Sequence, residues 1–510
     1  MHRYALPRQH QAPPVPQMRT PPLAPALPSS HRMKFLIGLC LLAFLAPATP
    51  AATTPPNIVF ILADDMGWGD LKANFPDGRI STPNLDRLAA AGMRFSDAHS
   101  ASAVCTPTRY GVLTGRYCWR SRLKKGVLGG WSPALIEPDR PTVASFLKTK
   151  GYATGCLGKW HLGMNWSPDS REFGDGIEPA RNPERIDFTQ RARGGPDDLG
   201  FDHWFGISAS LDMPPYAFIR DGLIEGKLTA RKKWIREGPA TPDFEAVDVL
   251  PALNRAAVAW LDERARHPQP FFLYLALPSP HTPVVPSSTW QGRSPIGPYG
   301  DFVMETDAVC GSILDALDRL KLAENTVVIF TSDNGATPDS SSKETDRRGH
   351  LSHGPWRGTK ADIWEGGHRV PFLARWPGHT PAGSVCHDPI CLNSLFATAA
   401  DLCGTPLPAG AAPDSFSIAP HLRGESPEKP THPYLIHHSI SGMFAIRRGP
   451  WKFIDGSGSG GWSKGGKDNH PAQLYHLGND PAESKNLFAT EPTTAAELKA
   501  LLDSCRNSEG

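Results

Sequence analysis

Two pairs of oxygen-bearing side chains lie far apart in this 510-residue sequence, and each pair directly follows a short apolar run. The first pair is Asp64-Asp65 and the second is Asp333-Asn334. Carboxylate and amide oxygens are the ligands that hard cations such as Ca²⁺ and Mg²⁺ prefer. Adjacent carboxylates in a buried crevice repel one another unless a cation lies between them. The pairs together indicate a divalent cation site, although each alone also fits a turn, a helix cap or a solvated loop.

Basic side chains form a complementary set. Lys159 and Lys360 carry point charges that can hold the oxygens of an anion, and the guanidinium of Arg109 can brace a neighbouring group and balance acidic charge. A lone lysine is usually a solvated surface residue. Lys159, however, lies in Leu-Gly-Lys-Trp-His-Leu-Gly, and Lys360 lies in Arg-Gly-Thr-Lys shortly before Trp-Glu-Gly-Gly. These contexts favour an anion site close to the acidic pairs.

His161 and His281 are the histidines that we assign to proton transfer. Imidazole donates or accepts a proton near neutral pH, so it suits both activation of a hydroxyl and protonation of a departing alcohol. Most of the 19 histidines are expected to be hydrogen-bonded structural residues instead. His161 and His281 differ because each follows an apolar run.

Four apolar runs predict buried parallel strands that deliver these groups: 57–63, 152–157, 271–277 and 326–332. Each is rich in β-branched, aromatic or aliphatic residues and is followed within a few positions by an ionisable side chain. Since the carboxyl ends of parallel strands meet at one edge of a sheet, the groups should converge there.

Helical patterns between the strands complete the predicted fold. We expect an α/β protein with a large mixed, mostly parallel sheet sandwiched by helices. A smaller C-terminal subdomain with an antiparallel sheet and a helix should follow a region rich in proline and glycine. The predicted divisions are an N-terminal extension and signal peptide at 1–52, a catalytic domain at 53–425 and the small-sheet subdomain at 426–510. The expected helices are 83–91, 142–150, 248–266, 302–320, 393–402 and 492–504, and the expected late strands are 432–439, 443–447 and 451–454.

Composition limits the partners of the chain. A formal net charge of +2 gives no overall field for nucleic acid or an anionic membrane surface, so neither is an expected partner. Residues 33–52 combine Met33-Lys34, an apolar run and a small-residue stretch, the pattern of a secretory signal. The apolar run at 35–46 is shorter than the roughly twenty residues that a membrane span needs. We expect export to the periplasm or medium without an integral membrane segment, and we expect Met33 to be the true start.

Nine cysteines occur in the sequence. Cys40 should leave with the signal peptide. No pair with the spacing of a cysteine zinc site exists, and disulfide pairing cannot be deduced from the sequence.

One cysteine lies in the motif Cys105-Thr-Pro-Thr-Arg109, which continues as Leu-Thr-Gly-Arg at 113–116. A buried cysteine beside a turn is the alternative interpretation. With Ala-Asp-Asp-Met-Gly-Trp-Gly-Asp, Gly-Lys-Trp-His-Leu-Gly, Pro-His-Thr-Pro, Ser-Asp-Asn-Gly and Arg-Gly-Thr-Lys, however, the motif resembles that of the type I sulfatases. The resemblance is to the arylsulfatase A-like branch within the alkaline phosphatase superfamily, and it covers residues 55–490.

The resemblance implies a sulfate ester hydrolase whose Cys105 is oxidised to Cα-formylglycine by a maturation enzyme of the producing cell. It implies a cation, Ca²⁺ in preference to Mg²⁺, that is bound by Asp64, Asp65, Cys105, Asp333 and Asn334. It implies catalytic roles for Cys105, Arg109, Lys159, His161, His281 and Lys360, of which Lys159, His281 and Lys360 also bind substrate.

The mechanism implied by the resemblance uses both hydroxyls of the hydrated aldehyde at position 105. One hydroxyl attacks sulfur, and His281 with Lys360 helps the alcohol to leave. The second hydroxyl, deprotonated with help from His161, expels sulfate and regenerates the aldehyde. A serine would lack this second hydroxyl.

Two other functions compete with this one. A phosphatase would have been favoured by a serine or threonine nucleophile with a two-metal, histidine-rich shell. A silent sulfatase-like protein that binds sulfated glycans would have been favoured by missing catalytic positions, and none is missing. We expect a sulfated carbohydrate, rather than a small aryl sulfate, to be the substrate. Trp204, Asp212, Tyr216, His437, His438 and Arg447 could line the mouth of the site, but each is equally compatible with a scaffold role.

Overall fold

The computed structural model describes residues 55–167, 185–338, 348–464 and 470–508. The predicted N-terminal extension and signal peptide at 1–52, with Met33 and Cys40, lie outside the described residues. Residues 54–510 form one structural unit. In the part of the chain that the structure describes, no helix is both long and apolar enough to span a bilayer. Each of the eight cysteines in the described ranges is free.

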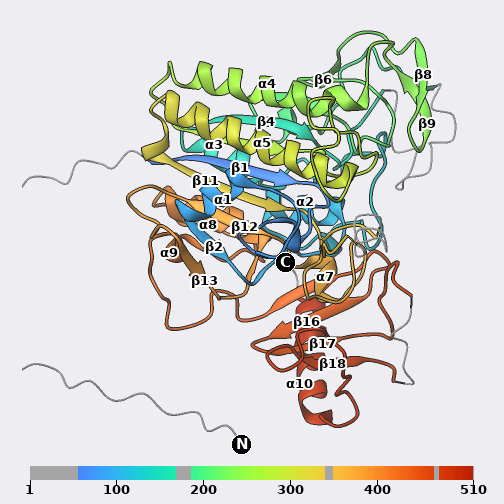
Figure 1. The fold of residues 1–510 in the computed structure, drawn as a ribbon, viewed down its shortest axis with the longest axis vertical. Coiled ribbons are helices and arrows are strands. Elements are labelled where there is room, and N and C mark those ends of the chain that lie inside the picture. The colour runs from blue at the N-terminus through green and yellow to red at the C-terminus, as the bar shows by residue number, and fades with distance from the viewer. Residues whose placement is uncertain (1–54, 168–184, 339–347, 465–469, 509–510) are drawn as a thin grey trace, which may run out of the picture. The chain divides into compact units, whose positions relative to one another are not determined.

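A ten-stranded sheet is the central element of this unit (Figure 1). Its order is β13-β2-β12-β11-β1-β10-β4-β5-β6-β7. The five strands from β11 to β5 in this order are all parallel, whereas the strands near both edges include antiparallel pairs. This confirms the predicted large mixed sheet. The strands are β1 (Asn57–Ala63), β2 (Met93–Phe95), β4 (Ala153–Lys159), β5 (His203–Ile207), β6 (Ile219–Arg220), β7 (Leu223–Ile224), β10 (Phe271–Ala276), β11 (Thr326–Ser332), β12 (Phe372–Arg375) and β13 (Ser384–Cys386).

The four predicted strands are β1, β4, β10 and β11. The bounds of β1 and β11 agree with the prediction, and β10 ends one residue early. β4 begins one residue late and continues to include Lys159. The sequence did not predict the edge strands, because runs of two to five residues carry too little periodic pattern to stand out.

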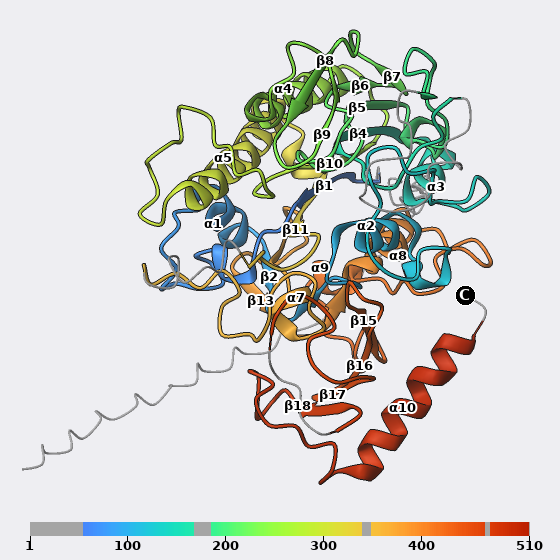
Figure 2. The same cartoon turned by 90° about the vertical axis from the view of Figure 1, so that its right-hand side faces the viewer.

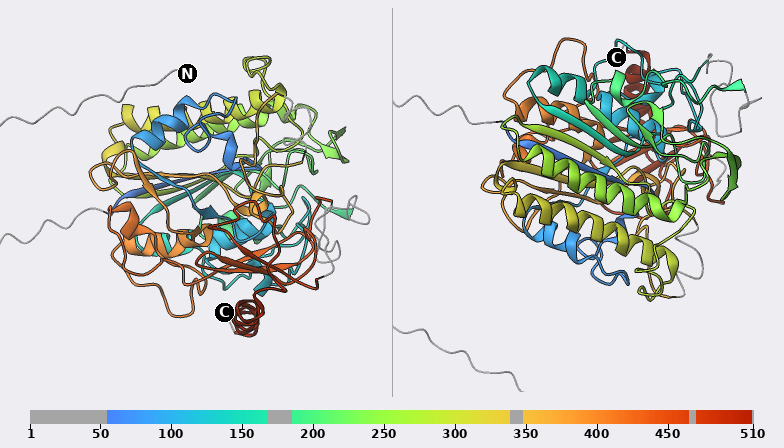
Figure 3. Two further views of the ribbon diagram at one scale, coloured as in Figure 1. Left: turned by 60° about the horizontal axis from the view of Figure 1, so that its bottom comes forward. Right: turned by 90° about the horizontal axis from the view of Figure 1, so that it is seen from above.

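Helices cover both faces of the sheet (Figures 1 and 3). Alternate side chains of β1 separate the two cores: Ile58 and Phe60 pack in the core with α2, α3 and α8, whereas Val59 and Ile61 pack in the core with α1, α4 and α5. A strand that is apolar on both faces is the pattern expected for a covered parallel sheet. The helices are α1 (Pro83–Ala90), α2 (Cys105–Thr114), α3 (Val143–Thr149), α4 (Ala246–Arg264), α5 (Pro298–Arg319), α7 (Glu365–His368), α8 (Leu395–Leu402), α9 (Ala419–Leu422) and α10 (Pro492–Asn507).

A separate four-stranded antiparallel sheet follows late in the chain (Figure 2). Leu498 and Leu502 of α10 pack with Ile446 and Phe453 of this sheet in one apolar cluster. The predicted small sheet with its helix is therefore present, while the division at 425/426 stays a prediction. The remaining strands are β15 (Leu435–His438), β16 (Phe444–Arg448), β17 (Trp451–Ile454) and β18 (Gln473–His476), with the two-stranded pairs β3 (Ala98–His99) with β14 (Ile390–Cys391) and β8 (Ala230–Lys233) with β9 (Glu237–Ala240).

Candidate active site

The two acidic pairs emerge side by side because β1 and β11 are parallel neighbours. Ala63 is in register with Ser332, so the next residues of both strands leave the sheet at the same level. The backbone N–H of Asp65 donates to Asp333 Oδ1 over 3.2 Å, and Asn334 Nδ2 donates to Asp65 Oδ1 over 2.7 Å. The sheet thus places four oxygen-bearing side chains together from positions 268 or more residues apart.

The Asp333-Asn334-Gly335 segment is more than an ordinary turn. A Cβ added at Gly335 would lie 1.9 Å from the carbonyl oxygen of Gly366, closer than any side chain allows. Glycine is therefore needed here so that two backbone segments can approach, a use of glycine that places the preceding residues tightly.

Cys105 is the first residue of α2, and every residue of this helix is buried. Its sulfur lies within 4.8 Å of carboxylate oxygens from Asp64 and Asp65 and of a ring nitrogen of His281. The sequence did not predict α2, because a helix buried on all sides lacks the apolar stripe that marks an amphipathic one. The helix places Cys105 directly against the acidic cluster.

Two buried lysines reach the same cluster from opposite parts of the chain. Lys159 Nζ donates to Asp64 Oδ2 over 2.7 Å, and Lys360 Nζ lies 2.7 Å from Asp65 Oδ1. The backbone of Lys360 is held by its N–H, which donates to the carbonyl oxygen of Ala336 over 2.8 Å. Both ammonium groups therefore lie where an anionic substrate beside Cys105 would need countercharge.

The Arg109 guanidinium is buried and contacts the carboxylates of Asp333 and Asp64. Its Nε donates to Asp333 Oδ2 over 2.9 Å, its Nη1 donates to the carbonyl oxygen of Lys159 over 3.1 Å, and its Nη2 lies 3.5 Å from Asp64 Oδ1. These contacts fix the orientation of Asp333 and neutralise part of the acidic charge.

Burial and crowding shift the ionisation of the acidic groups. Burial opposes ionisation of Asp64, but Lys159, His281 and Arg109 outweigh it and hold the pKa of that carboxyl well below its usual range. Burial and the neighbouring Asp64 raise the pKa of Asp333 to about 7. The raised pKa of Asp333 reflects repulsion between the carboxylates of Asp64 and Asp333, and a bound cation would relieve that repulsion.

The Cys105 thiol is a weak acid in this pocket. Burial raises its pKa to about 11, even though Lys159 and Lys360 act to lower it. The unmodified side chain is therefore a protonated thiol at neutral pH, which is a poor nucleophile.

The two assigned histidines occupy different environments. His281 Nε2 lies 3.6 Å from Asp65 Oδ2, and its Nδ1 lies 4.0 Å from Asp212 Oδ1. His161 Nε2 donates to the carbonyl oxygen of Leu128 over 2.7 Å, while its buried Nδ1 has no hydrogen-bond partner. Burial, Lys159 and Arg109 hold the pKa of His161 well below its usual range. His161 is therefore neutral, and its Nδ1 has a lone pair without a hydrogen-bond partner.

The candidates for the mouth of the site divide into two groups. Asp212 lies beside His281, and the Tyr216 hydroxyl donates to its carbonyl oxygen over 2.9 Å. Trp204 lies in the core, where it is fully buried, so it cannot line a mouth. His437, His438 and Arg447 are buried in the C-terminal region: Arg447 pairs with Asp97, His437 stacks on His368, and His438 packs against Phe444.

Arg236 is a residue that the sequence analysis missed. It lies between β8 and β9 and pairs with the Asp212 carboxylate. Nothing in the local sequence marks it, because the contact depends on how the β8–β9 hairpin folds against the 212 loop.

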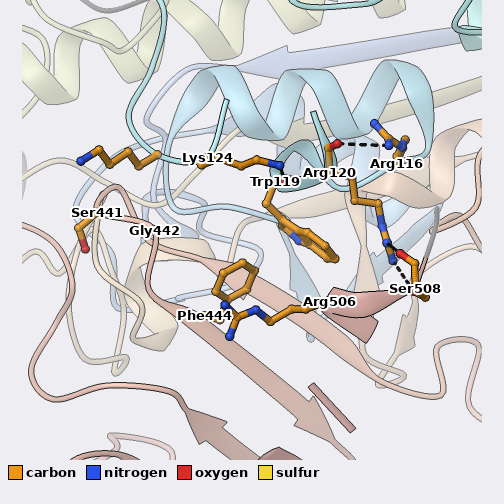
Figure 4. Close-up of a pocket in the computed structure, with 10 residues that line it drawn as sticks. Arg116, Trp119, Arg120, Lys124, Ser441, Gly442, Phe444, Arg506 and Ser508 are labelled. Atoms are coloured by element: carbon orange, nitrogen blue, oxygen red, sulfur yellow. Dashed lines mark hydrogen bonds between the residues drawn. The ribbon is translucent and has the colours of Figure 1, made fainter. Parts of the chain in front are cut away.

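A basic pocket of about 670 Å³ is lined by the segment after α2, by β16 with the residues before it, and by the end of α10 (Figure 4). None of the residues assigned to the candidate site lines it. None of its lining residues is acidic. It is lined by Arg116, Trp119, Arg120, Lys124, Lys125, Ser441, Gly442, Phe444, Arg506 and Ser508.

Comparisons with known proteins agree with this geometry. The family described as Sulfatase matches residues 56–405. The N-acetylgalactosamine-6-O-sulfatase of Bacteroides thetaiotaomicron is 32% identical over 498 residues, which cover 88% of this chain and 93% of the relative. Arylsulfatase A of Homo sapiens is 37% identical over 459 residues, which cover 86% and 84%. A solved structure from work on glycosaminoglycan metabolism by Bacteroides thetaiotaomicron is 31% identical with a TM-score of 0.78, and the match covers 89% of this chain and all of that one.

The buried position of Arg109 predicts a large stability effect. Replacing Arg109 with methionine leaves Asp333 and Asp64 without their guanidinium, and we expect the free energy of unfolding to fall by about 3–5 kcal/mol. Urea denaturation followed by circular dichroism measures this. Lys148→Met is the control, since the half-exposed pair of Lys148 with Asp202 should contribute less than about 1 kcal/mol. Equal effects of the two substitutions would contradict the role of Arg109.

Proposed function

This chain belongs to the sulfatase family and is a sulfuric ester hydrolase, and we propose that it removes sulfate from sulfated sugars. The observation that carries the proposal is the approach of Cys105 Sγ, Asp64, Asp65 and His281 to within 4.8 Å of one another. We propose 6-O-sulfated N-acetylgalactosamine as the first substrate to test, on the strength of the relatives that are named for it.

The donor set at the strand ends fits a hard divalent cation. Asp64 Oδ1 and Asn334 Oδ1 are buried and have no hydrogen-bond partner. Both oxygens can therefore coordinate a cation without the loss of a hydrogen bond. We propose that Ca²⁺ is held by Asp64, Asp65, Asp333, Asn334 and the modified residue at 105. When bound, the ion supplies positive charge next to the sulfuryl oxygens.

We further propose that Cys105 is converted to Cα-formylglycine by a maturation enzyme of the producing cell. The support is the Cys-Thr-Pro-Thr-Arg motif together with the buried, protonated state of the thiol. In its hydrated form this residue would offer two hydroxyls, one to attack sulfur and one to release sulfate.

The remaining side chains have roles that follow from their positions. Lys159 and Lys360 bind the sulfuryl oxygens, because their ammonium groups already converge on the acidic cluster. His281 donates a proton to the departing sugar oxygen, which leaves as a hydroxyl, and Lys360 contacts the same Asp65 carboxylate as His281. His161 accepts a proton at Nδ1 from the residue at 105. Arg109 is a positioning residue, since it contacts Asp333 and Asp64 rather than substrate.

Export is also part of the proposal. The apolar run at 35–46, after Met33-Lys34 and before a small-residue stretch, supports an N-terminal signal peptide. An exported enzyme would meet sulfated polysaccharides outside the cytoplasm.

A substrate panel tests the proposed function. Enzyme from a host that can mature Cys105 is assayed against 6-O-sulfated N-acetylgalactosamine, other sulfated hexosamines and galactosides, a phosphate monoester and nitrophenyl sulfate. We expect sugar sulfates to be cleaved and Cys105→Ala to lower kcat by roughly 10⁴-fold or more.

Cys403→Ala is the matched control, because Cys403 is a half-buried cysteine remote from the proposed chemistry. It should retain wild-type turnover. Cleavage of nitrophenyl sulfate without any sugar sulfate would overturn the substrate class, and an active Cys105→Ala variant would overturn the nucleophile.

The loss of activity on replacing His281 should depend on how much the leaving group needs a proton. A sugar alkoxide needs a proton to depart, so His281→Ala should lower kcat/KM for a sugar sulfate by roughly 10²–10⁴-fold. Nitrophenolate leaves without one, and the loss on nitrophenyl sulfate should be much smaller. His267→Ala, at a half-exposed histidine, is the control for both substrates. Equal losses on the two substrates would show that His281 is not the acid.

A further inference from the structure

A second cluster of buried titratable groups lies outside the proposed catalytic machinery. It contains three histidines from three separate elements: His99 of β3, His368 of α7 and His437 of β15. All three are fully buried. Since β15 belongs to the late antiparallel sheet, the cluster joins that sheet to the segments around the catalytic region.

The three imidazoles converge closely. His99 Nδ1 lies 3.0 Å from His368 Nδ1, and the rings of His368 and His437 stack with centroids 3.8 Å apart. One ring nitrogen from each histidine lies within 4.8 Å of the others. Two nitrogens bound to a tetrahedral zinc ion lie about 3.3 Å apart, since each bond is about 2.0 Å long. The His99 ring is already well placed toward the other two, whereas the stacked rings of His368 and His437 would have to turn apart, because a metal ion lies in the plane of each imidazole that binds it.

The outward nitrogens have the acceptors that metal-binding histidines need. His99 Nε2 lies 2.6 Å from Asp97 Oδ1, and His437 Nδ1 lies 3.3 Å from the carbonyl oxygen of Ser100. His368 Nε2 lies 3.2 Å from the carbonyl oxygen of Ile363. A proton on each outward nitrogen leaves the inward lone pair free, which is the arrangement that second-shell acceptors impose on metal ligands.

From this geometry we propose that His99, His368 and His437 bind a zinc-type divalent transition metal ion in a structural site. Three imidazole nitrogens favour such an ion over the hard cation proposed for the oxygen-rich site. The ion would fix β15 to α7 and β3 and so hold the late sheet against the catalytic region. This site is independent of the proposed sulfatase chemistry.

A metal-free arrangement of the same groups leaves a defect. Lys452 Nζ lies 3.0 Å from His368 Nε2 and could donate to it, after which His368 Nδ1 would donate to His99. His437 Nε2 would still be buried without a hydrogen-bond partner. A buried, unsatisfied polar atom is costly, and the metal ion supplies the missing partner.

Three basic side chains and three carboxylates surround the cluster and balance one another in charge. Arg447 pairs with Asp97 over 2.6 Å, Arg369 with Glu365 over 2.8 Å, and Lys452 with Glu483 over 2.9 Å. Each basic side chain therefore already has a carboxylate partner.

The experiment measures the metal content of the full chain. The protein is produced with zinc in the medium, passed over a chelating resin and analysed for zinc and calcium by mass spectrometry of the elements. We expect about one zinc ion per chain in the wild type, because a buried three-histidine site retains its ion, and background zinc in His437→Ala. His438→Ala is the control, since it removes the next imidazole of the same strand and should keep the zinc. Asp333→Ala should keep it too.

Cobalt substitution of the wild type gives a readout that does not depend on a variant folding. Cobalt held by three imidazoles in a tetrahedral site should show intense visible d–d absorption that added zinc abolishes. A folded wild-type protein without bound transition metal, after both growth and refolding with zinc, would overturn the proposal. Equal zinc in the wild type and His437→Ala would overturn it as well.

Discussion

The carboxyl groups of Asp64, Asp65 and Asp333 are buried together, where they repel one another. Three basic side chains compensate this repulsion. The parallel pairing of β1 with β11 forces the carboxyl groups into proximity. Lys159, Lys360 and Arg109 then reach the cluster from β4, from the loop after β11 and from α2, each with a nitrogen within 3 Å of a carboxylate oxygen. Like charges that are crowded in a low dielectric need such compensation. Lys159 and Lys360 are also the two of these groups that we propose contact an anionic substrate beside Cys105, so the burial of the acids and the proposed chemistry share one electrostatic constraint.

The central part of the fold and the convergence of the site could be predicted from the sequence because parallel strands carry a direct signal. Apolar runs such as 57–63 end abruptly in ionisable residues, and the carboxyl ends of parallel neighbours coincide. Other features carried no such signal. The α2 helix is buried on every side and so lacks a stripe, and the edge strands are too short to show a period. Arg447 was a reasonable candidate for the mouth of the site by residue type, but its pairing with Asp97, 350 positions away, depends on tertiary packing that no local pattern reveals.

The oxygen-rich cluster and the histidine cluster are two groups of buried ionisable side chains that differ in the atoms they offer to a ligand. The first, at the strand ends, combines carboxylates with lysines and leaves Asp64 Oδ1 and Asn334 Oδ1 without a hydrogen bond. The second pairs each of its cations with a carboxylate and leaves the nitrogen of His437 unpartnered. Buried polar atoms rarely stay unsatisfied in native proteins, so unpartnered atoms are informative about ligands. Hard oxygen donors at the first site and imidazoles at the second call for different ions, which lets their contents be measured separately.

The central claim is that residue 105 is no longer a thiol in the active enzyme. Mass spectrometry of the proteolytic peptide that contains this residue, taken from a preparation with measured sulfatase activity, tests the claim most directly. We expect a peptide in which the elements of hydrogen sulfide are replaced by oxygen, and which reacts with an aldehyde-specific hydrazide. A fully active preparation in which residue 105 is found only as unmodified cysteine would contradict the account.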